Sequence, residues 1–125
     1  MIVYAAAELG RAISPSIVIG RDVMGAAETF REFCNRQVET FRTTLPHFQR
    51  EQEGEGRVHD LDAFRMTFTW NSAAGLLRQR VFFISAGAGV VVTFAASSGV
   101  EDFARHEQAF DQALSSLAIR STETV

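Results

Sequence analysis

The stretch LLRQRVFFI, residues Leu76–Ile84, decides how this chain folds. In a β-strand, successive side chains point to opposite faces of the sheet. One face of this segment then carries Leu77, Gln79, Val81 and Phe83, and the other carries Leu76, Arg78, Arg80, Phe82 and Ile84. Both faces are largely apolar, so the strand needs cover on both sides. A chain of 125 residues has little material to provide that cover, which raises the question of what lies on the second face.

The composition is that of one globular domain. Hydrophobic residues make up 46% of the chain and charged residues 22%, which is typical of a folded domain and not of a disordered one. The net charge is −3 and the 12 basic residues are scattered, so we expect no nucleic-acid partner. The chain has 11 Phe but one Tyr and one Trp, a balance that favours the exclusion of water over polar recognition.

Three features of the sequence bear on its compartment. Cys34 is the one cysteine, so the chain forms no internal disulfide, which fits a reducing compartment. The N-terminal segment MIVYAAAELGRAISP has neither the basic region nor the long apolar core of a signal peptide. No apolar run approaches the ~18 residues of a membrane span. We therefore expect a soluble cytoplasmic protein that does not insert into a membrane.

The first half of the chain predicts strand and then helix. Residues Ser16–Ile19 form a short apolar run typical of a strand, and Ile2–Ala6 is a possible earlier one. From Gly25 onward, apolar residues recur at three- and four-residue steps as far as Leu45. Pro46 ends this helix because a proline disfavours helical geometry in the residue before it.

The second half predicts an antiparallel meander and a closing helix. Residues 54–56, GEG, indicate a turn, and strands are expected within 58–70, 76–84 and 90–96, with turns at 71–75, 87–89 and 97–99. In the last segment Phe103, Phe110, Leu114 and Leu117 are spaced for one face of a helix. The sequence therefore predicts an α+β fold with an antiparallel sheet and two amphipathic helices packed on one face.

Residue patterns of known catalytic or metal sites do not occur. His47, His59 and His106 have no Cys, Asp or Glu at a recognised metal-ligand spacing. Cys34 lies in the apolar stripe of the first helix, where a small buried hydrophobe is favoured over a reactive thiol. There is no G-x-S-x-G nucleophile motif. We expect no catalytic residue, no metal and no cofactor, and an enzyme such as a small hydrolase is disfavoured.

Several segments, taken in order, carry a resemblance to a known family. They are IVIGRD (Ile17–Asp22), TTLPHFQRE (Thr43–Glu51), RMTFTW (Arg65–Trp70), LRQRVFFI (Leu77–Ile84) and DFARHEQAF (Asp102–Phe110). The ordered set, spread over roughly residues 14–119, resembles the DcrB-like family of PsbP-like fold. Within that family the chain resembles the Eag chaperones of bacterial type VI secretion. The single domain, residues 1–125, is expected to lack the strand-turn-strand segment with which the family usually begins, and Gly20 replaces a serine usual in the family.

The resemblance implies a function and a set of binding residues. Eag chaperones are cytoplasmic homodimers that hold the N-terminal transmembrane helices of secreted effectors before export. A bound client helix would then cover the second sheet face. The residues expected to bind the client are Gln79, Gln37, Ile17, Ile19, Phe68, Phe83 and Phe94.

Gln79 is the most informative of these residues because it places an amide between Leu77 and Val81 on an apolar strand face. It either donates to and accepts from polar groups of a client helix or is a structural glutamine bonded to a neighbouring loop. Similarly, either Ile17 and Ile19 or Val18 point away from the helices, and the sequence leaves the choice open. An alternative function is a non-enzymatic structural or scaffold domain of the same fold without a membrane-helix client.

Overall fold

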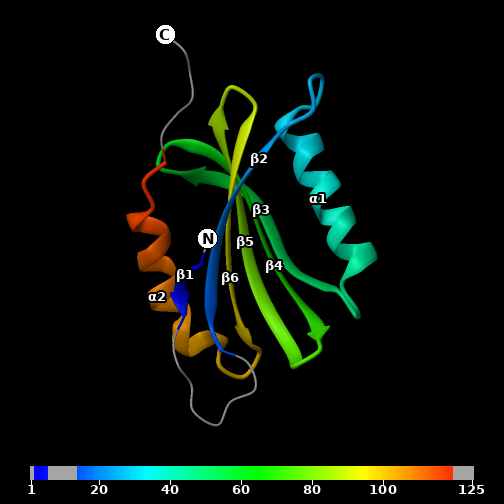
Figure 1. Cartoon of the computed structure of the whole chain (residues 1–125), viewed down its shortest axis with the longest axis vertical. Helices are drawn as coiled ribbons and strands as arrows, with labels where there is room; N and C mark the ends of the chain where they lie inside the picture. Colours follow the sequence, from blue (N-terminus) through cyan, green and yellow to red (C-terminus); the bar gives the residue numbers. More distant parts are fainter. Residues whose placement is uncertain (1, 6–13, 120–125) are drawn as a thin grey trace.

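The computed structural model describes residues 2–5 and 14–119, which form six strands and two helices. In chain order these are β1 (Ile2–Ala5), β2 (Ser16–Val23), α1 (Phe30–Thr44), β3 (Gln49–Val58), β4 (Leu61–Ser72), β5 (Gly75–Gly87), β6 (Val90–Gly99) and α2 (Phe103–Ser116). The strands form one sheet in the order β1-β2-β6-β5-β4-β3, and every neighbouring pair is antiparallel. The sheet is twisted and lies between the two helices (Figure 1).

Two-residue turns connect the strands of the meander. His59 and Asp60 both have positive φ, at 51° and 63°, and they join β3 to β4. Ala88 and Gly89 do the same between β5 and β6, with φ of 53° and 77°. Two consecutive positive φ values are typical of the hairpin turn whose twist matches the strands that it joins.

The turn expected at residues 54–56 is wrong, because Gly54 and Gly56 lie inside β3. They pair with Arg65 and Ala63 of β4. β3 is an edge strand, and a side chain added at either glycine would meet nothing within 4 Å. A glycine therefore leaves no packing gap at this edge, and the strand continues to the turn at His59.

The first helix begins where its capping residues lie. The Thr29 hydroxyl accepts from the backbone N–H of Glu32 at 3.1 Å, and the Glu32 carboxylate accepts from the backbone N–H of Thr29 at 2.9 Å. This reciprocal capping box satisfies two N–H groups that a helix start leaves unpaired. The helix therefore starts at Phe30, later than the expected Gly25, and it ends at Thr44, just before Pro46 as expected.

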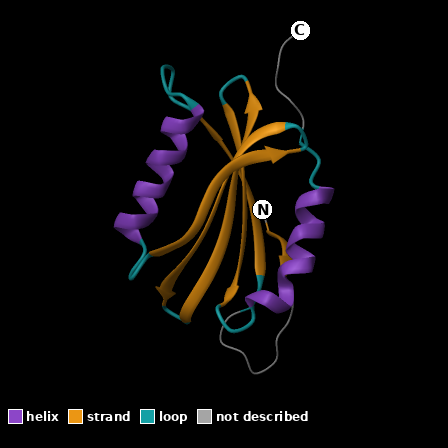
Figure 2. Ribbon diagram, turned by 180° about the vertical axis from the view of Figure 1, so that it is seen from behind, coloured by secondary structure: helices purple, strands orange, loops and turns teal. Residues whose placement is uncertain are grey.

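The two helices cover opposite faces of the sheet (Figure 2). On one face the rings of Phe33 in α1 and Phe83 in β5 lie 5.9 Å apart between centroids. On the other, Phe103 and Phe110 of α2 join a cluster against which Phe82 packs. The α+β class is confirmed, but the expectation that both helices pack on one face is wrong. Because β5 is apolar on both faces, a helix on each side buries more apolar surface than two on one side.

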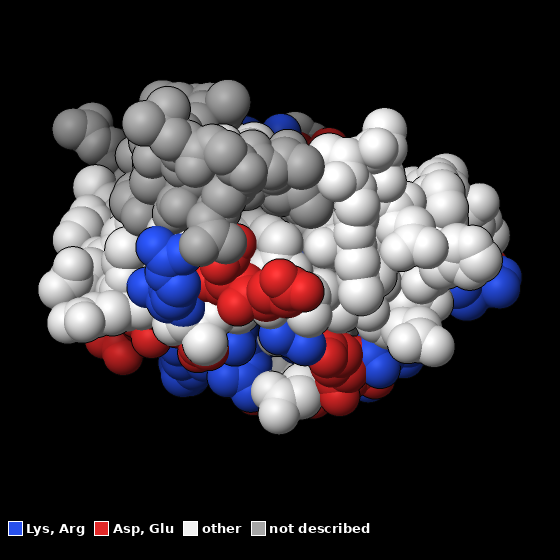
Figure 3. Space-filling view, turned by 90° about the horizontal axis from the view of Figure 1, so that it is seen from below, with Lys and Arg blue, Asp and Glu red and all other residues white. Residues whose placement is uncertain are grey.

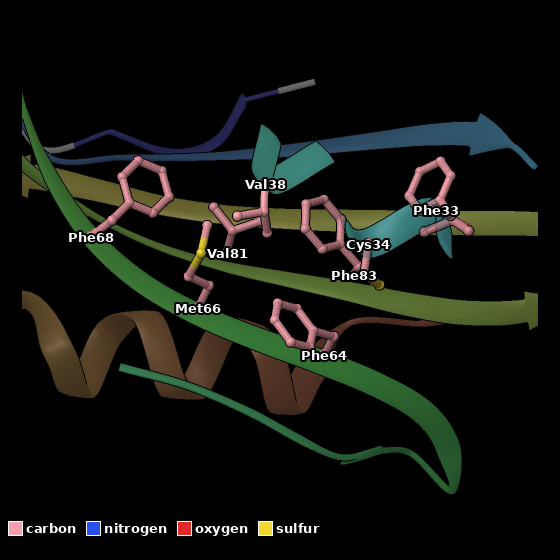
Figure 4. Close-up of a cluster of buried hydrophobic side chains, with 9 residues drawn as sticks. Phe33, Cys34, Val38, Phe64, Met66, Phe68, Val81 and Phe83 are labelled. Carbon is pink, nitrogen blue, oxygen red and sulfur yellow. The ribbon is translucent and has the colours of Figure 1, made fainter. Parts of the chain in front are cut away.

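Each face therefore has its own core. The core under α1 combines three residues of that helix with residues of β4, β5 and β6, namely Phe33, Cys34, Val38, Phe64, Met66, Phe68, Val81, Phe83 and Val91. Figure 4 shows most of these side chains gathered in one cluster. The core under α2 contains Ile17, Phe94, Ala96, Phe103 and Phe110. A third cluster continues it along the same face with Ala63, Ile84, Ala86 and Val92.

Candidate functional site

The face that α1 packs against is only partly covered by that helix. The α1 core lies mainly over β4 and β5, whereas β2 lies two strands away from β5 on the same sheet. Val18 of β2 points to this face, because it pairs with Ala95 and Ala95 pairs with Val81 of the α1 core. The Val18 side chain is 42% exposed. This part of the sheet therefore presents apolar surface that neither of the two described helices covers.

We call this area the open surface and define it by residues on one face of four adjacent strands. Their side chains are half-buried or exposed, and none is charged. The residues are Ser16, Val18 and Gly20 of β2, Thr93, Ala95 and Ser97 of β6, Leu77 and Gln79 of β5, and Trp70 of β4. Most of these side chains are small, which allows another chain to approach the backbone closely.

A row of polar side chains crosses the open surface at right angles to the strands. Gln79 lies opposite Ser97 in the pairing of β5 with β6, and Ser97 lies opposite Ser16 in the pairing of β6 with β2. The hydroxyl oxygens of Ser16 and Ser97 are 3.0 Å apart and share a hydrogen bond. Trp70 completes the row, since its indole N–H donates to the Gln79 side-chain oxygen at 2.5 Å. We call these four residues the polar row.

Gln79 therefore satisfies both sequence-based interpretations in part. Its oxygen has a structural partner, although that partner is the indole of Trp70 and not a loop. Within residues 2–5 and 14–119, its amide nitrogen makes no hydrogen bond, and the side chain is only half-buried. One end of the amide is thus available to a binding partner.

Gln37 lies on the same side of the sheet as Gln79. It is half-buried on α1, one turn from Phe33 and from Phe41, whose rings contact Phe83. The other flank of the helix, with Arg31, Asn35 and Val38, faces β3 across a shallow depression. By helical geometry Gln37 is on the flank turned away from β3, toward the open surface.

The remaining predicted residues lie in the chain's own cores. Phe68 and Phe83 face the same side as Gln79 but are at most 2% exposed in the α1 core. Ile17 and Phe94 are equally buried on the opposite face against α2, and Ile19 packs partly buried beside them. The structure therefore brings Gln79 and Gln37 to one face and leaves the three residues of the α2 side apart from them.

Sequence reasoning missed several residues of the open surface. The sequence leaves open whether Val18 or the pair Ile17 and Ile19 points away from the helices. Val18 is 42% exposed and Ile17 is buried, so Val18 is the residue that faces away from α2. The sequence predicts a turn at Ser97, but β6 continues to Gly99. Trp70 ends the strand expected within residues 58–70, and the sequence alone indicates no role for it. A buried tryptophan usually donates its indole N–H to an acceptor, so Trp70 itself indicated that a polar side chain lies beside it.

The face covered by α2 has its own arginine cluster, which is internally paired. The Arg78 guanidinium donates to both carboxylate oxygens of Glu51, at 2.8 and 3.0 Å. Arg80 lies 3.6 Å from Glu107, and both guanidinium groups lie over the Phe103 ring, at 5.8 and 5.1 Å from its centroid. Both guanidinium groups thus lie against a ring of α2, and their charges are paired with carboxylates of β3 and α2.

Charged side chains elsewhere are mixed in sign. Seen from below, acidic and basic groups alternate across the surface, and neither sign forms a separate patch (Figure 3). On this face the described charges thus form no extended positive patch of the kind that tracks nucleic-acid backbones.

A cavity of about 430 Å³ lies between α1 and the β3–β4 hairpin, on the α1 side. Its apolar lining includes Phe30, Phe64 and Cys34, and pairs of opposite charge lie at its rim, including Arg31 with Glu55. Burial raises the pKa of the Cys34 thiol to about 11, so the thiol is protonated at neutral pH. An uncharged thiol is a poor nucleophile and a poor metal ligand.

Metal ligation finds no support in the described part of the chain, where no three His, Cys, Asp or Glu side chains gather. His59 is a turn residue whose ring nitrogen lies 3.2 Å from the backbone oxygen of Leu114. Across the same residues, neither helix has the length and apolar character needed to cross a membrane.

Comparison with known proteins places these features in a family. The DcrB family model matches residues 1–116. Effector EagT6 of Pseudomonas aeruginosa, strain PAO1, is 28% identical over 113 residues, which are 90% of this chain and 78% of that protein.

Solved structures give the same result for the fold. The crystal structure of the protein PA94 from Pseudomonas aeruginosa, described as having unknown function, has a TM-score of 0.85 at 26% identity and covers 98% of this chain and 85% of its own. Cyanobacterial PsbP (CyanoP) from Synechocystis has a TM-score of 0.63 at 8% identity, covering 93% of this chain and 81% of its own, which shows a shared PsbP-like fold. With the family model spanning residues 1–116, the chain belongs to the DcrB family, and within it resembles EagT6.

Proposed function

We propose that this protein is a cytoplasmic, non-enzymatic chaperone or adaptor that shields the N-terminal transmembrane helices of a type VI secretion effector before export. One observation carries the proposal. The open surface is an uncharged, partly exposed sheet area crossed by the polar row, whereas the described cores of the two sheet faces lie under α1 and α2. The similarity to EagT6 supports the link to type VI secretion.

The dimensions of the open surface suit one helix. Neighbouring strands lie ~4.8 Å apart, so the three strands β2, β6 and β5 span ~10 Å between outer axes. An α-helix with its side chains is ~10–12 Å across. A client helix lying along the strands would therefore rest on β6, with β2 and β5 on either side.

The length of the open surface supports a homodimer. Along β2 the open surface runs from Ser16 to Gly20, which corresponds to ~17 Å at ~3.4 Å per residue. A membrane-spanning helix of ~20 residues is ~30 Å long. Two copies of the surface, placed end to end along the client, would together cover the span that one copy leaves half exposed.

The proposed role needs no catalytic group and no cofactor. An apolar span of ~20 residues aggregates in water unless a partner covers it, and burial of apolar surface supplies the binding free energy. Gln79 and Gln37 would bind polar groups of the client helix, and Val18 and Ala95 would pack against its apolar side chains. The other residues that the sequence predicts to bind the client would act indirectly, by holding the sheet in shape; these are Ile17, Ile19, Phe68, Phe83 and Phe94.

Co-expression with a synthetic client tests the proposal. The client is a lysine-flanked helix of ~20 apolar residues at the N-terminus of a soluble reporter domain. We expect the protein to keep the fusion in the soluble fraction and to co-purify with it, whereas a reporter without the helix remains unbound. A fusion that is equally insoluble with and without the protein would overturn the proposal and favour a scaffold domain without a client.

A further inference from the structure

Trp70 and Gln79 form a pair in which the chemistry of one residue fixes the orientation of the other. The indole N–H of Trp70 is only a donor, so the group 2.5 Å from it in Gln79 must be the amide oxygen. The amide nitrogen is then on the side away from Trp70. This assignment follows from the donor character of the indole and does not depend on telling oxygen from nitrogen by position.

The side of Gln79 away from Trp70 belongs to the open surface. Gln79 pairs with Ser97 of β6, and Ser97 pairs with Ser16 of β2. The two serine hydroxyls already share a hydrogen bond with each other. Among the described residues, the two N–H groups of the Gln79 amide remain without an acceptor, beside the area where the proposed client would lie.

We infer that Trp70 is a positioning residue that makes Gln79 a hydrogen-bond donor toward the client, so the surface selects helices carrying an acceptor oxygen at that level. Suitable acceptors are the ether or hydroxyl oxygen of a side chain and a backbone carbonyl with a free lone pair. This inference rests on the proposed function and adds to it the polarity of the contact. Without Trp70 the amide is free to turn and can present either its oxygen or its nitrogen.

A pair of isosteric peptides measures this polarity. The probe is a fluorophore-labelled, lysine-flanked helix of ~20 Leu and Ala residues that contains either O-methylserine or norvaline at one position. The two side chains have the same shape, and only O-methylserine has an oxygen, which accepts but does not donate. The substitution is moved through one helical turn in separate peptides, so that one of them faces Gln79. Affinity is read from fluorescence anisotropy.

The wild-type protein is expected to bind the O-methylserine peptide about fivefold more tightly than the norvaline peptide at one position of the turn. Gln79→Glu keeps an acceptor for Trp70 but has no donor, so the preference disappears. Gln79→Leu also loses it. Trp70→Phe reduces the preference because the amide orientation is no longer fixed. Phe48→Leu, which removes a ring of the same core that has no hydrogen-bonding group, retains it.

A second readout needs no client. Trp70 is the only tryptophan, so the emission of the free protein reports its indole directly. We expect Gln79→Glu to keep the wild-type emission maximum and Gln79→Leu to shift it, which a merely space-filling Gln79 would not produce.

The outcomes separate this inference from the function on which it rests. If the wild-type protein binds neither peptide, the proposed function fails and the inference fails with it. Equal binding of both peptides at every position would overturn the inference alone. A preference that survives in Gln79→Glu, or that is unchanged in Trp70→Phe, would also overturn it.

Discussion

Phe82 and Phe83 are consecutive residues of β5, and their rings lie on opposite faces of the sheet. The Phe83 ring centroid is 5.9 Å from that of Phe33 in α1, and the Phe82 centroid is 6.2 Å from that of Phe94 on the α2 side. This relationship explains why the central strand is apolar on both faces. Each face has a helix of its own, and a client helix is left with only the area that α1 does not reach.

Truncation of these two rings should have unequal effects on stability. Phe83→Ala removes a ring that is 2% exposed, and we expect it to lower the free energy of unfolding by ~3–5 kcal/mol. Phe82 is only half-buried, so Phe82→Ala should cost about half as much. Urea denaturation followed by circular dichroism measures both. Equal losses would mean that the two faces are packed equally well, contrary to the observed burial.

The open surface can be tested by placing a charge in it. Val18→Asp puts a carboxylate against the apolar side of a bound client, where it has no partner. We expect at least about a tenfold loss of client affinity, because an unpaired buried charge costs more than ~1.4 kcal/mol. Retention of the synthetic span in the soluble fraction, together with anisotropy of the labelled peptide, measures the loss.

Val23→Asp is the matched control for this variant. Val23 lies on the same strand, is 67% exposed, and is on the opposite face because it is an odd number of residues from Val18. Val18→Asp and Val23→Asp both replace valine by aspartate in the same strand, so the loss of β-strand propensity is the same in the two variants. If both variants lose the client equally, or if neither does, the client does not bind at the open surface.

Sequence reasoning identified the elements better than their arrangement. The strand expected within residues 58–70 and the helix that ends before Pro46 both follow from local patterns, and the structure has a strand and a helix there. The prediction of a turn at Gly54–Gly56 was wrong because glycine occurs in hairpin turns and also in edge strands. In this edge strand a missing side chain leaves no gap in the packing. The face that each helix covers depends on packing between segments that are distant in sequence. The alternation of residues along one strand carries no information about that packing.

The candidate site shows the same limit. Gln79 was identifiable because a polar residue interrupts an apolar strand face, and the pattern also indicated that the amide needed a partner. Its pairing with Trp70, and the row that continues to Ser97 and Ser16, depend on the register of four strands. A shift of one residue in any pair would move half of these side chains to the other face.

Glu28 should make stability depend on pH in the acid range. The Arg36 guanidinium donates to both of its carboxylate oxygens, at 2.9 and 3.0 Å, and the backbone N–H of Gly25 donates to one of them. These bonds lower the pKa of Glu28 from its ordinary value of 4.5 to about 2. The folded protein therefore binds this proton less readily than the unfolded chain does. The stabilisation is present above pH 4.5 and is lost as the pH falls toward 2.

Glu28→Gln is expected to lower stability at neutral pH and to flatten the decline between pH 4.5 and 2. Thermal unfolding at a series of pH values measures the difference from wild type. Glu101→Gln serves as the control, since Glu101 is exposed and forms no ion pair among the described residues. An acid limb with the same slope in wild type and Glu28→Gln would contradict the assignment.

Cys34 should be inert in the folded protein and reactive in the unfolded chain. Its thiol is 1% exposed, and burial raises the pKa to about 11 from an ordinary value of 9.0. The folded state thus retains the thiol proton to higher pH than the unfolded chain does, so this contribution to stability is full below pH 9.0 and is lost as the pH rises toward 11. We expect a chromogenic disulfide reagent to react with Cys34 slowly in buffer and rapidly in denaturant.

Cys34→Ala should retain client binding, because the cavity beside Cys34 lies at the β3–β4 hairpin and outside the open surface. Rapid labelling of the native protein would contradict the burial of Cys34, and loss of client binding in Cys34→Ala would show that the cavity takes part in binding.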